Sequence, residues 1–169
     1  EEERRLSLAG AGPRDYDPAK DMLVVNPDQA PAPNQHVLLW GRAHRYFVPS
    51  FPGPLSIKSV PVGRASWTTD EARHELGEAS YLIINDAHPY TIEIESKEPV
   101  ETFCVFFARG FVEAALYSQR RDEALLDAPE SREMASFREV LQSRDGSVGA
   151  ELSKLRDIAG SPNQRAVVD

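Results

Sequence analysis

Apolar and polar residues alternate in several short runs between about residues 55 and 107. The clearest run is residues 90–95, in which the apolar positions are Tyr90, Ile92 and Ile94. An alternation with a period of two places these side chains on one face, which is typical of a half-buried antiparallel strand. The stretch lies between Pro-rich sequence upstream and helix-like sequence downstream, so we expect the function to be carried out inside or around it.

Turn-forming residues divide this stretch, and the sequence before it, into short segments. Gly41 is expected to end one strand, and residues 97–99 are expected to form a turn. The polar pair Asp70-Glu71 between two alternating runs predicts a β-hairpin. Strands at such spacing predict a sandwich or barrel. The expected strands cover residues 23–25, 37–40, 45–48, 55–60, 65–69, 72–76, 81–84, 90–96 and 102–107.

The hydrophobic period becomes helical after Gly110. Residues 111–116 fit a short helix, a second is expected from Pro129 to Gly146, and a third has an apolar stripe that extends to Ile158. The last two would form an αα-hairpin, whose apolar faces must be buried on the barrel, on each other or on a second copy of the chain. We expect a homodimer through these helices, with candidate contact residues Met134, Phe137, Leu141, Val148, Leu152 and Leu155.

The chain therefore divides into three expected parts. Residues 1–20 are polar and contain Gly and Pro, which predicts a flexible arm. Residues 21–110 form the barrel, and residues 111–169 form a helical region for dimerisation and linkage. A chain of 169 residues is long enough to bury roughly 70% of the surface of its unfolded form, so a core can form without disulfides or metals.

Composition narrows the function classes. The formal net charge of −8 argues against direct contact with nucleic acid, because phosphate binding needs clustered Lys and Arg. Cys104 is the only cysteine, so no intramolecular disulfide can form, which favours a reducing, cytoplasmic setting. Its apolar neighbours predict a buried structural thiol. No apolar run approaches the roughly 18 residues of a membrane span, and we expect no membrane contact.

Candidate chemistry is sparse. His74 and His88 could approach each other in space and form a metal site with a carboxylate. A metal-binding barrel usually carries two histidines two positions apart on one strand, but Ala72 and Leu76 occupy those positions around His74. We therefore expect no metal and no cofactor. There is no Gly-x-Ser-x-Gly motif, and we expect no catalytic residue.

Aromatic residues in the strands could line a ligand pocket or belong to a plain core, and the sequence leaves both interpretations open. A pocket needs a few polar groups between apolar walls, and Thr and His residues of the same strands are the nearest polar groups. The candidate ligand-binding residues are Trp67, Thr69, His74, Tyr81, His88, Tyr90 and Phe103.

Several runs resemble the N-terminal sensor domains of AraC-type bacterial transcription regulators. They are Leu55-Ser56-Ile57-Lys58 with Gly63, residues 81–92 and residues 99–107; the stretch 98–111 is the most specific, and the resemblance covers about residues 37–116. It implies a cupin-like, jelly-roll antiparallel barrel followed by helices, a small-molecule effector in the barrel, and dimerisation. It also implies a DNA-binding domain with two helix-turn-helix units, which we expect to lie outside this chain because no basic region of that kind occurs before Asp169.

The sequence departs from the enzymatic cupins, because their Gly-rich, Pro-containing turn is reduced here to residues 76–80. The leading hypothesis is therefore a small-molecule-sensing and dimerising domain that is not an enzyme. The alternative is a stand-alone metal-dependent cupin enzyme of the dioxygenase or isomerase type. A third interpretation is a dimerisation module that binds no ligand.

Overall fold

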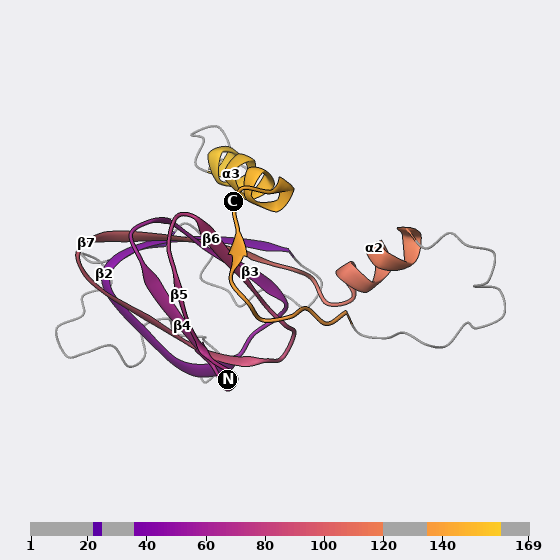
Figure 1. Cartoon of the computed structure of the whole chain (residues 1–169), viewed down its shortest axis with the longest axis horizontal. Helices are drawn as coiled ribbons and strands as arrows, with labels where there is room; N and C mark the ends of the chain where they lie inside the picture. Colours follow the sequence, from indigo (N-terminus) through magenta and orange to yellow (C-terminus); the bar gives the residue numbers. More distant parts are fainter. Residues whose placement is uncertain (1–21, 25–35, 120–134, 160–169) are drawn as a thin grey trace, which may run out of the picture.

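The computed structural model describes residues 22–24, 36–119 and 135–159, and antiparallel strands make up about half of these residues. The described strands form one sheet, and two helices accompany it (Figure 1). The predicted mainly-β fold is confirmed. The elements are β1 (Met22–Val24), β2 (Val37–Pro52), β3 (Ser56–Val62), β4 (Ala65–Thr69), β5 (Arg73–Leu76), β6 (Ser80–Ile84), β7 (Pro89–Phe106), α2 (Phe111–Gln119), β8 (Gln142–Ser143) and α3 (Ser147–Ala159).

β2 and β7 are each continuous where the sequence predicted two strands. They pair antiparallel from Val37 opposite Phe106 to Pro52 opposite Pro89. Gly41 does not end a strand: it lies opposite Thr102, whose Oγ1 would be 3.0 Å from a Cβ at this position. The glycine therefore permits close packing across the ladder.

The expected turn at residues 97–99 is a bulge inside β7. The register changes from Ala43 opposite Val100 to Arg45 opposite Glu95, so residues 96–99 lie opposite His44 alone. His44 Nδ1 lies 3.0 Å from the carbonyl oxygen of Lys97 and fixes the bulge. Because a bulge bends its strand and increases the local twist, β7 can run through the whole sheet while the sheet curls.

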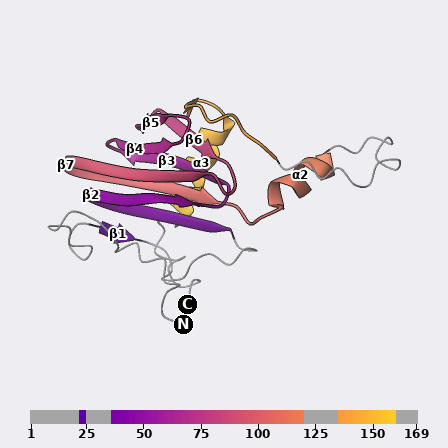
Figure 2. The ribbon, with the colours of Figure 1, turned by 90° about the horizontal axis from the view of Figure 1, so that it is seen from below.

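The sheet curls because the two halves of β7 have different neighbours on one edge. Its second half pairs with β3, from Ser56 opposite Phe106, and its first half pairs with β4, from Thr69 opposite Tyr90. The strand order is β1-β2-β7-β3-β6-β8, with the predicted β4–β5 hairpin attached to β7. Figure 2 shows the long β2–β7 pair beneath these shorter strands. Among the described strands, the result is a half-barrel with an inner and an outer face.

The inner face holds the larger hydrophobic cluster, which includes Trp67, Leu82 and Tyr90, all at most 1% exposed. The outer face of β3, β6 and β7 is covered by α3, whose Leu152 is 2% exposed. The expected stripe of α3 is slightly rotated, because Ala159 packs against the sheet whereas Ile158 is 48% exposed. Both faces of these strands are therefore buried.

The predicted αα-hairpin is wrong for the described residues. Residues 135–141 contain no helix, and β8 pairs with the edge of β6. The reason lies in Asn85: its side chain accepts a hydrogen bond from the Phe137 amide and donates one to the Phe137 carbonyl, both at 2.8 Å. These are backbone groups that a helix would use internally. Pro129, Met134 and the arm 1–20 lie outside the described residues.

The short helix after Gly110 is confirmed as α2, which lies to one side of the sheet in Figure 1. His36 packs edge-on against the ring of Phe111 with ring centroids 4.4 Å apart, so the start of α2 is fixed to the start of β2. None of the helices in the described residues is long and apolar enough to cross a membrane.

Candidate functional site

A buried lysine lies at the centre of the inner face. The side chains of Ser56, Lys58 and Val60 share that face, because alternate residues of β3 point the same way. Lys58 lies opposite Cys104 of β7 and Leu82 of β6, in one row across the half-barrel. It has no exposed surface. A fully buried lysine is rare unless its charge is paired, so the described groups around the Lys58 ammonium group are unusual in carrying no opposite charge.

The ammonium group of Lys58 lies between aromatic groups. Its Nζ donates a hydrogen bond to Tyr90 Oη at 2.9 Å. It also lies 4.0 Å from the ring centroid of Phe106 and 4.4 Å from that of Tyr90, within the range of cation–π attraction. The backbone also approaches Tyr90 closely at Gly53, where a Cβ would lie 2.9 Å from the tyrosine ring.

Burial controls the charge at this site. Desolvation lowers the pKa of Lys58 to about 8, and the interaction with Cys104 opposes this only in part. Burial raises the pKa of the Tyr90 phenol and that of the Cys104 thiol, so both groups stay neutral around pH 7. Lys58 remains mostly protonated there. The inner face therefore contains a cation, and no carboxylate contributes to its electrostatics among the described residues.

Other buried polar groups on the inner face lack hydrogen-bond partners. They are Trp67 Nε1, His74 Nε2 and Ser56 Oγ, all without a partner among the described residues. Trp67 and His74 face each other across the β4–β5 ladder, whereas Ser56 is two positions from Lys58 on β3. Because most buried polar atoms in proteins are hydrogen-bonded, three unpaired polar atoms on one concave face are an unusual feature of this half-barrel.

A second polar cluster lies at one rim of the half-barrel. His88 Nδ1 lies 2.5 Å from Glu139 Oε1, and His88 Nε2 hydrogen-bonds to Asp70 in the β4–β5 turn. The side chain of Glu139 is 1% exposed, whereas that of Asp70 is 74% exposed. The bond to Asp70, helped by Glu139, raises the pKa of His88, and the same bond lowers the pKa of Asp70. His88 thus binds the 135–143 segment to the sheet.

The rim cluster does not form a ligand set for a metal. Asp70 and Glu139 bind opposite nitrogen atoms of the His88 ring, so the two carboxylates do not converge on one point. No group of three or more His, Cys, Asp or Glu side chains that could hold a metal ion occurs within residues 22–24, 36–119 and 135–159.

The seven candidate ligand-binding residues lie in four places. Trp67, His74 and Tyr90 share the inner face. Thr69 closes the hairpin turn, where its Oγ1 accepts hydrogen bonds from the amides of residues 71 and 72 at 3.3 Å, and His88 lies at the rim. Tyr81 and Phe103 lie on the outer face beneath α3. A ligand on the inner face cannot contact these last two side chains.

Lys58 is not among the candidate ligand-binding residues that the sequence predicts. In residues 55–60 neither alternating set is entirely apolar, because Ser56 and Lys58 share one face and Ser59 lies on the other. The alternation of apolar and polar residues that marks a half-buried strand is lost, because β3 is buried on both faces, under α3 and inside the half-barrel. A lysine in an otherwise buried run was the available clue.

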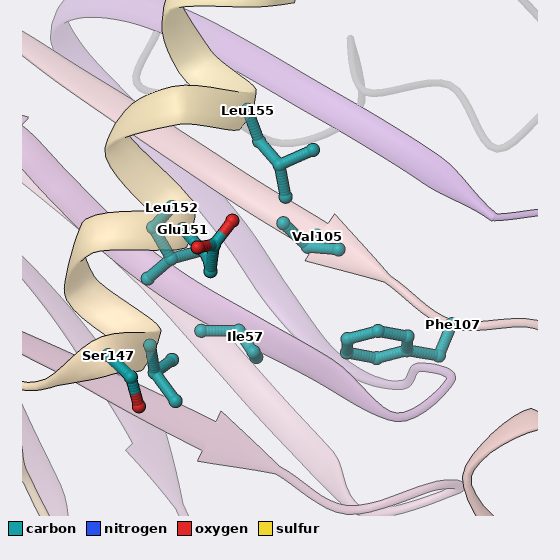
Figure 3. A pocket seen from close by; sticks show the side chains of 8 residues that line it. Ile57, Val105, Phe107, Ser147, Glu151, Leu152 and Leu155 are labelled. Atoms are coloured by element: carbon teal, nitrogen blue, oxygen red, sulfur yellow. The ribbon is translucent and has the colours of Figure 1, made fainter. Parts of the chain in front are cut away.

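The candidate dimer residues are also dispersed. Met134 lies outside the described residues, and the backbone of Phe137 is bound by Asn85. Leu152 and Leu155 pack inside the chain against the outer face of the sheet, as Figure 3 shows beside Val105. Exposed apolar side chains nevertheless remain near this region; they are Val140, Leu141, Val148 and Ile158.

No protein-family model matches this sequence, and no curated protein matches it. Among solved structures, the Cupin_2 domain of an XRE-family transcriptional regulator from Enterobacter cloacae is similar, at 14% identity over 52% of this chain and 97% of that chain, with a TM-score of 0.40. ToxT from Vibrio cholerae O395, bound to (E)-4-(8-methylnaphthalen-1-yl)but-3-enoic acid, is 13% identical over 76% of this chain and 49% of that chain, with a TM-score of 0.46.

DMSP lyase DddQ from Ruegeria pomeroyi DSS-3 is 14% identical, with a TM-score of 0.36 over 43% of this chain and 39% of that chain. This chain therefore corresponds to about half of ToxT and to less of DddQ. Regulators and an enzyme occur among these similar structures, so the similarity concerns the fold and assigns no activity.

Proposed function

We propose that this chain is the small-molecule-sensing domain of a bacterial AraC-type transcription regulator, and that it binds an effector without transforming it. The proposal is supported by the sequence resemblance and by one observation above all: the inner face buries polar groups that the described protein leaves unpaired. Each buried polar group without a hydrogen-bond partner lowers the stability of the fold by about 1–3 kcal/mol, so a core filled only by its own side chains gains nothing from such groups. A bound molecule would supply their partners.

The rim provides a route from the interior to α3. Tyr90 contacts Lys58 inside, and it lies two residues after His88, which binds Glu139. The segment that contains Glu139 continues through β8 into α3. An effector that moves Tyr90 would therefore change how firmly this segment is held, and so shift the population of α3 positions. In the proposed regulator, this shift changes the spacing of the attached DNA-binding domains.

A ligand screen tests the sensing proposal. Thermal shift and calorimetric titration of the chain with a metabolite panel should identify a compound that raises the melting temperature. Tyr90→Phe on the inner face should weaken its binding, whereas Tyr81→Phe on the outer face should not. Binding that depends on Tyr81 alone, or a panel in which no compound binds, would refute the proposed sensing site.

We further propose that the chain dimerises through the exposed side of α3. Leu152→Asp is unsuitable as a test, because Leu152 is 2% exposed and supports the attachment of α3 to the sheet. Ile158→Asp changes a side chain of α3 that is 48% exposed. Sedimentation should show a dimer that dissociates in this variant but persists in Lys97→Met, which alters an exposed residue of β7. A monomeric parent chain, or a dimer that Ile158→Asp leaves intact, would contradict the proposal.

A further inference from the structure

The buried Lys58 carries information about the chemistry of the effector. Its ammonium group has three N–H donors, and one of them is directed to Tyr90 Oη. Burying an ammonium group is costly unless it is paired, and the aromatic rings beside it neutralise no charge. Within the described residues, no ion pair involves Lys58, and Cys104, which interacts with it, is a thiol whose pKa is raised by burial and which stays neutral near pH 7. The site therefore contains a cation without a protein counter-ion.

The unpaired groups on the same inner face as Lys58 are rich in donors. Trp67 Nε1 can only donate, and Ser56 Oγ and His74 Nε2 can each donate. A molecule that pairs with these atoms must therefore present acceptors. A carboxylate presents two oxygen atoms with about four acceptor positions and carries the charge that Lys58 lacks. A neutral sugar or amine would leave the cation uncompensated.

The walls of the site are apolar and aromatic. Phe51 packs against Tyr90 with ring centroids 4.7 Å apart, and Phe106 covers the ammonium group of Lys58. Phe51, Phe106 and Leu39 are only partly buried, and Phe106 is one of the two rings that cover Lys58. Rotation of these rings would admit a molecule with an apolar body.

We propose that the half-barrel binds a small organic carboxylate with an apolar body, and that Lys58 holds its charged group. This inference rests on the proposed sensing function and adds the chemical class of the effector. In the complex, the carboxylate becomes the counter-ion of Lys58 and accepts hydrogen bonds from the unpaired donors. Tyr90, which already hydrogen-bonds to Lys58, registers the arrival of the ligand.

A matched library tests this inference. Apolar and aromatic carboxylic acids are each paired with their primary amide, which has nearly the same shape but no charge, and both are titrated by thermal shift and calorimetry against the whole chain. Binding should concentrate among the acids, with an acid bound about tenfold or more tightly than its amide, because a charge-assisted contact is lost in the amide.

Lys58→Met should reduce the affinity for the acid to that for the amide, whereas Lys154→Met should leave both unchanged. The comparison of acid and amide in the unaltered chain needs no variant, so it remains decisive if Lys58→Met does not fold. Equal binding of acids and amides, or an acid preference that survives in a folded Lys58→Met chain, would overturn the carboxylate inference and leave sensing intact. No binding by any acid or amide would overturn both proposals.

Discussion

Replacing the buried lysine by an apolar side chain should stabilise the ligand-free protein. Methionine is unbranched and fills nearly the same path, so Lys58→Met removes the charge with little change of shape. The phenol of Tyr90 would then lose the hydrogen bond that links it to Lys58. Combining Lys58→Met with Tyr90→Phe removes both partners together and avoids a newly unpaired hydroxyl group.

The expected magnitude follows from the pKa of Lys58. Burial lowers it from 10.5 to about 8, and one pKa unit corresponds to about 1.4 kcal/mol. The charged lysine therefore lowers the free energy of unfolding by about 3 kcal/mol near pH 7. Solvent does not screen this effect, because the side chain is fully buried. The double variant should gain about that much free energy of unfolding, and Lys58→Met alone should gain less.

The gain should depend on pH. Between about 8 and 10.5 the unfolded chain holds the lysine proton and the folded chain has released it, so the lysine's cost falls as pH rises. The advantage of the double variant should shrink from about 3 kcal/mol near pH 7 to about 1 kcal/mol near pH 9.5. Burial raises the pKa of the Cys104 thiol and Lys58 lowers it in part, so removing Lys58 makes the thiol cost the variant more stability at alkaline pH and shrinks its advantage further.

Urea denaturation at several pH values measures these differences. Lys154→Met is the matched control: it removes a charge from a side chain that is 66% exposed, so its stability should stay within about 0.5 kcal/mol of the parent at every pH. A double variant that is less stable than the parent near pH 7, or a gain that does not change with pH, would refute the charged, unneutralised state of Lys58.

Three further changes test other contacts. His88→Gln should lower the melting temperature more near pH 6 than near pH 9. The raised pKa of His88 stabilises the fold at pH values below the unfolded pKa of about 6.5, and this stabilisation is lost as the pH rises through the folded pKa. Equal losses of melting temperature at both pH values would contradict this. Gly149→Ala should lower the free energy of unfolding in urea by at least about 2 kcal/mol, because its Cβ would lie 1.9 Å from the carbonyl oxygen of Arg144. Gly146→Ala is the control and should lower it little, because no atom lies within 4 Å of a Cβ at that position. Equal effects of the two changes would show that α3 adjusts freely. Ser56→Ala should stabilise the ligand-free chain by up to about 1 kcal/mol by removing an unpaired hydroxyl group, and a loss of stability would reveal a hydrogen-bond partner for it.

Local patterns predicted the strands well where one face is clearly more polar. The alternation at residues 90–95 identified Tyr90 and Ile94 as inward, and both are buried. The β4–β5 hairpin also follows directly from its polar turn. The continuity of β2 and β7 was not predictable, because Gly41 and residues 96–99 resemble strand ends until their partner strand is known.

The features that create the candidate site depend on distant contacts. Phe137 and Leu141 have helical spacing, yet Asn85, which is 52 residues from Phe137 in sequence, takes the backbone hydrogen bonds of Phe137 and keeps this segment out of a helix. Tyr81 and Leu82 are adjacent and both can be buried in an apolar core, and the attachment of α3 decides which one faces outward. Tertiary structure therefore overrides local preference at these positions.

The bulge of β7 opposite His44 has a consequence for how the sequence can vary. A one-residue insertion within a regular strand turns every following side chain to the opposite face. Residues 96–99 separate β7 into two registers, one that sets the inward face around Tyr90 and one that sets it around Cys104. Changes of length at the bulge leave both faces in place, whereas a single insertion between Tyr90 and Glu95 would turn part of the inner wall outward.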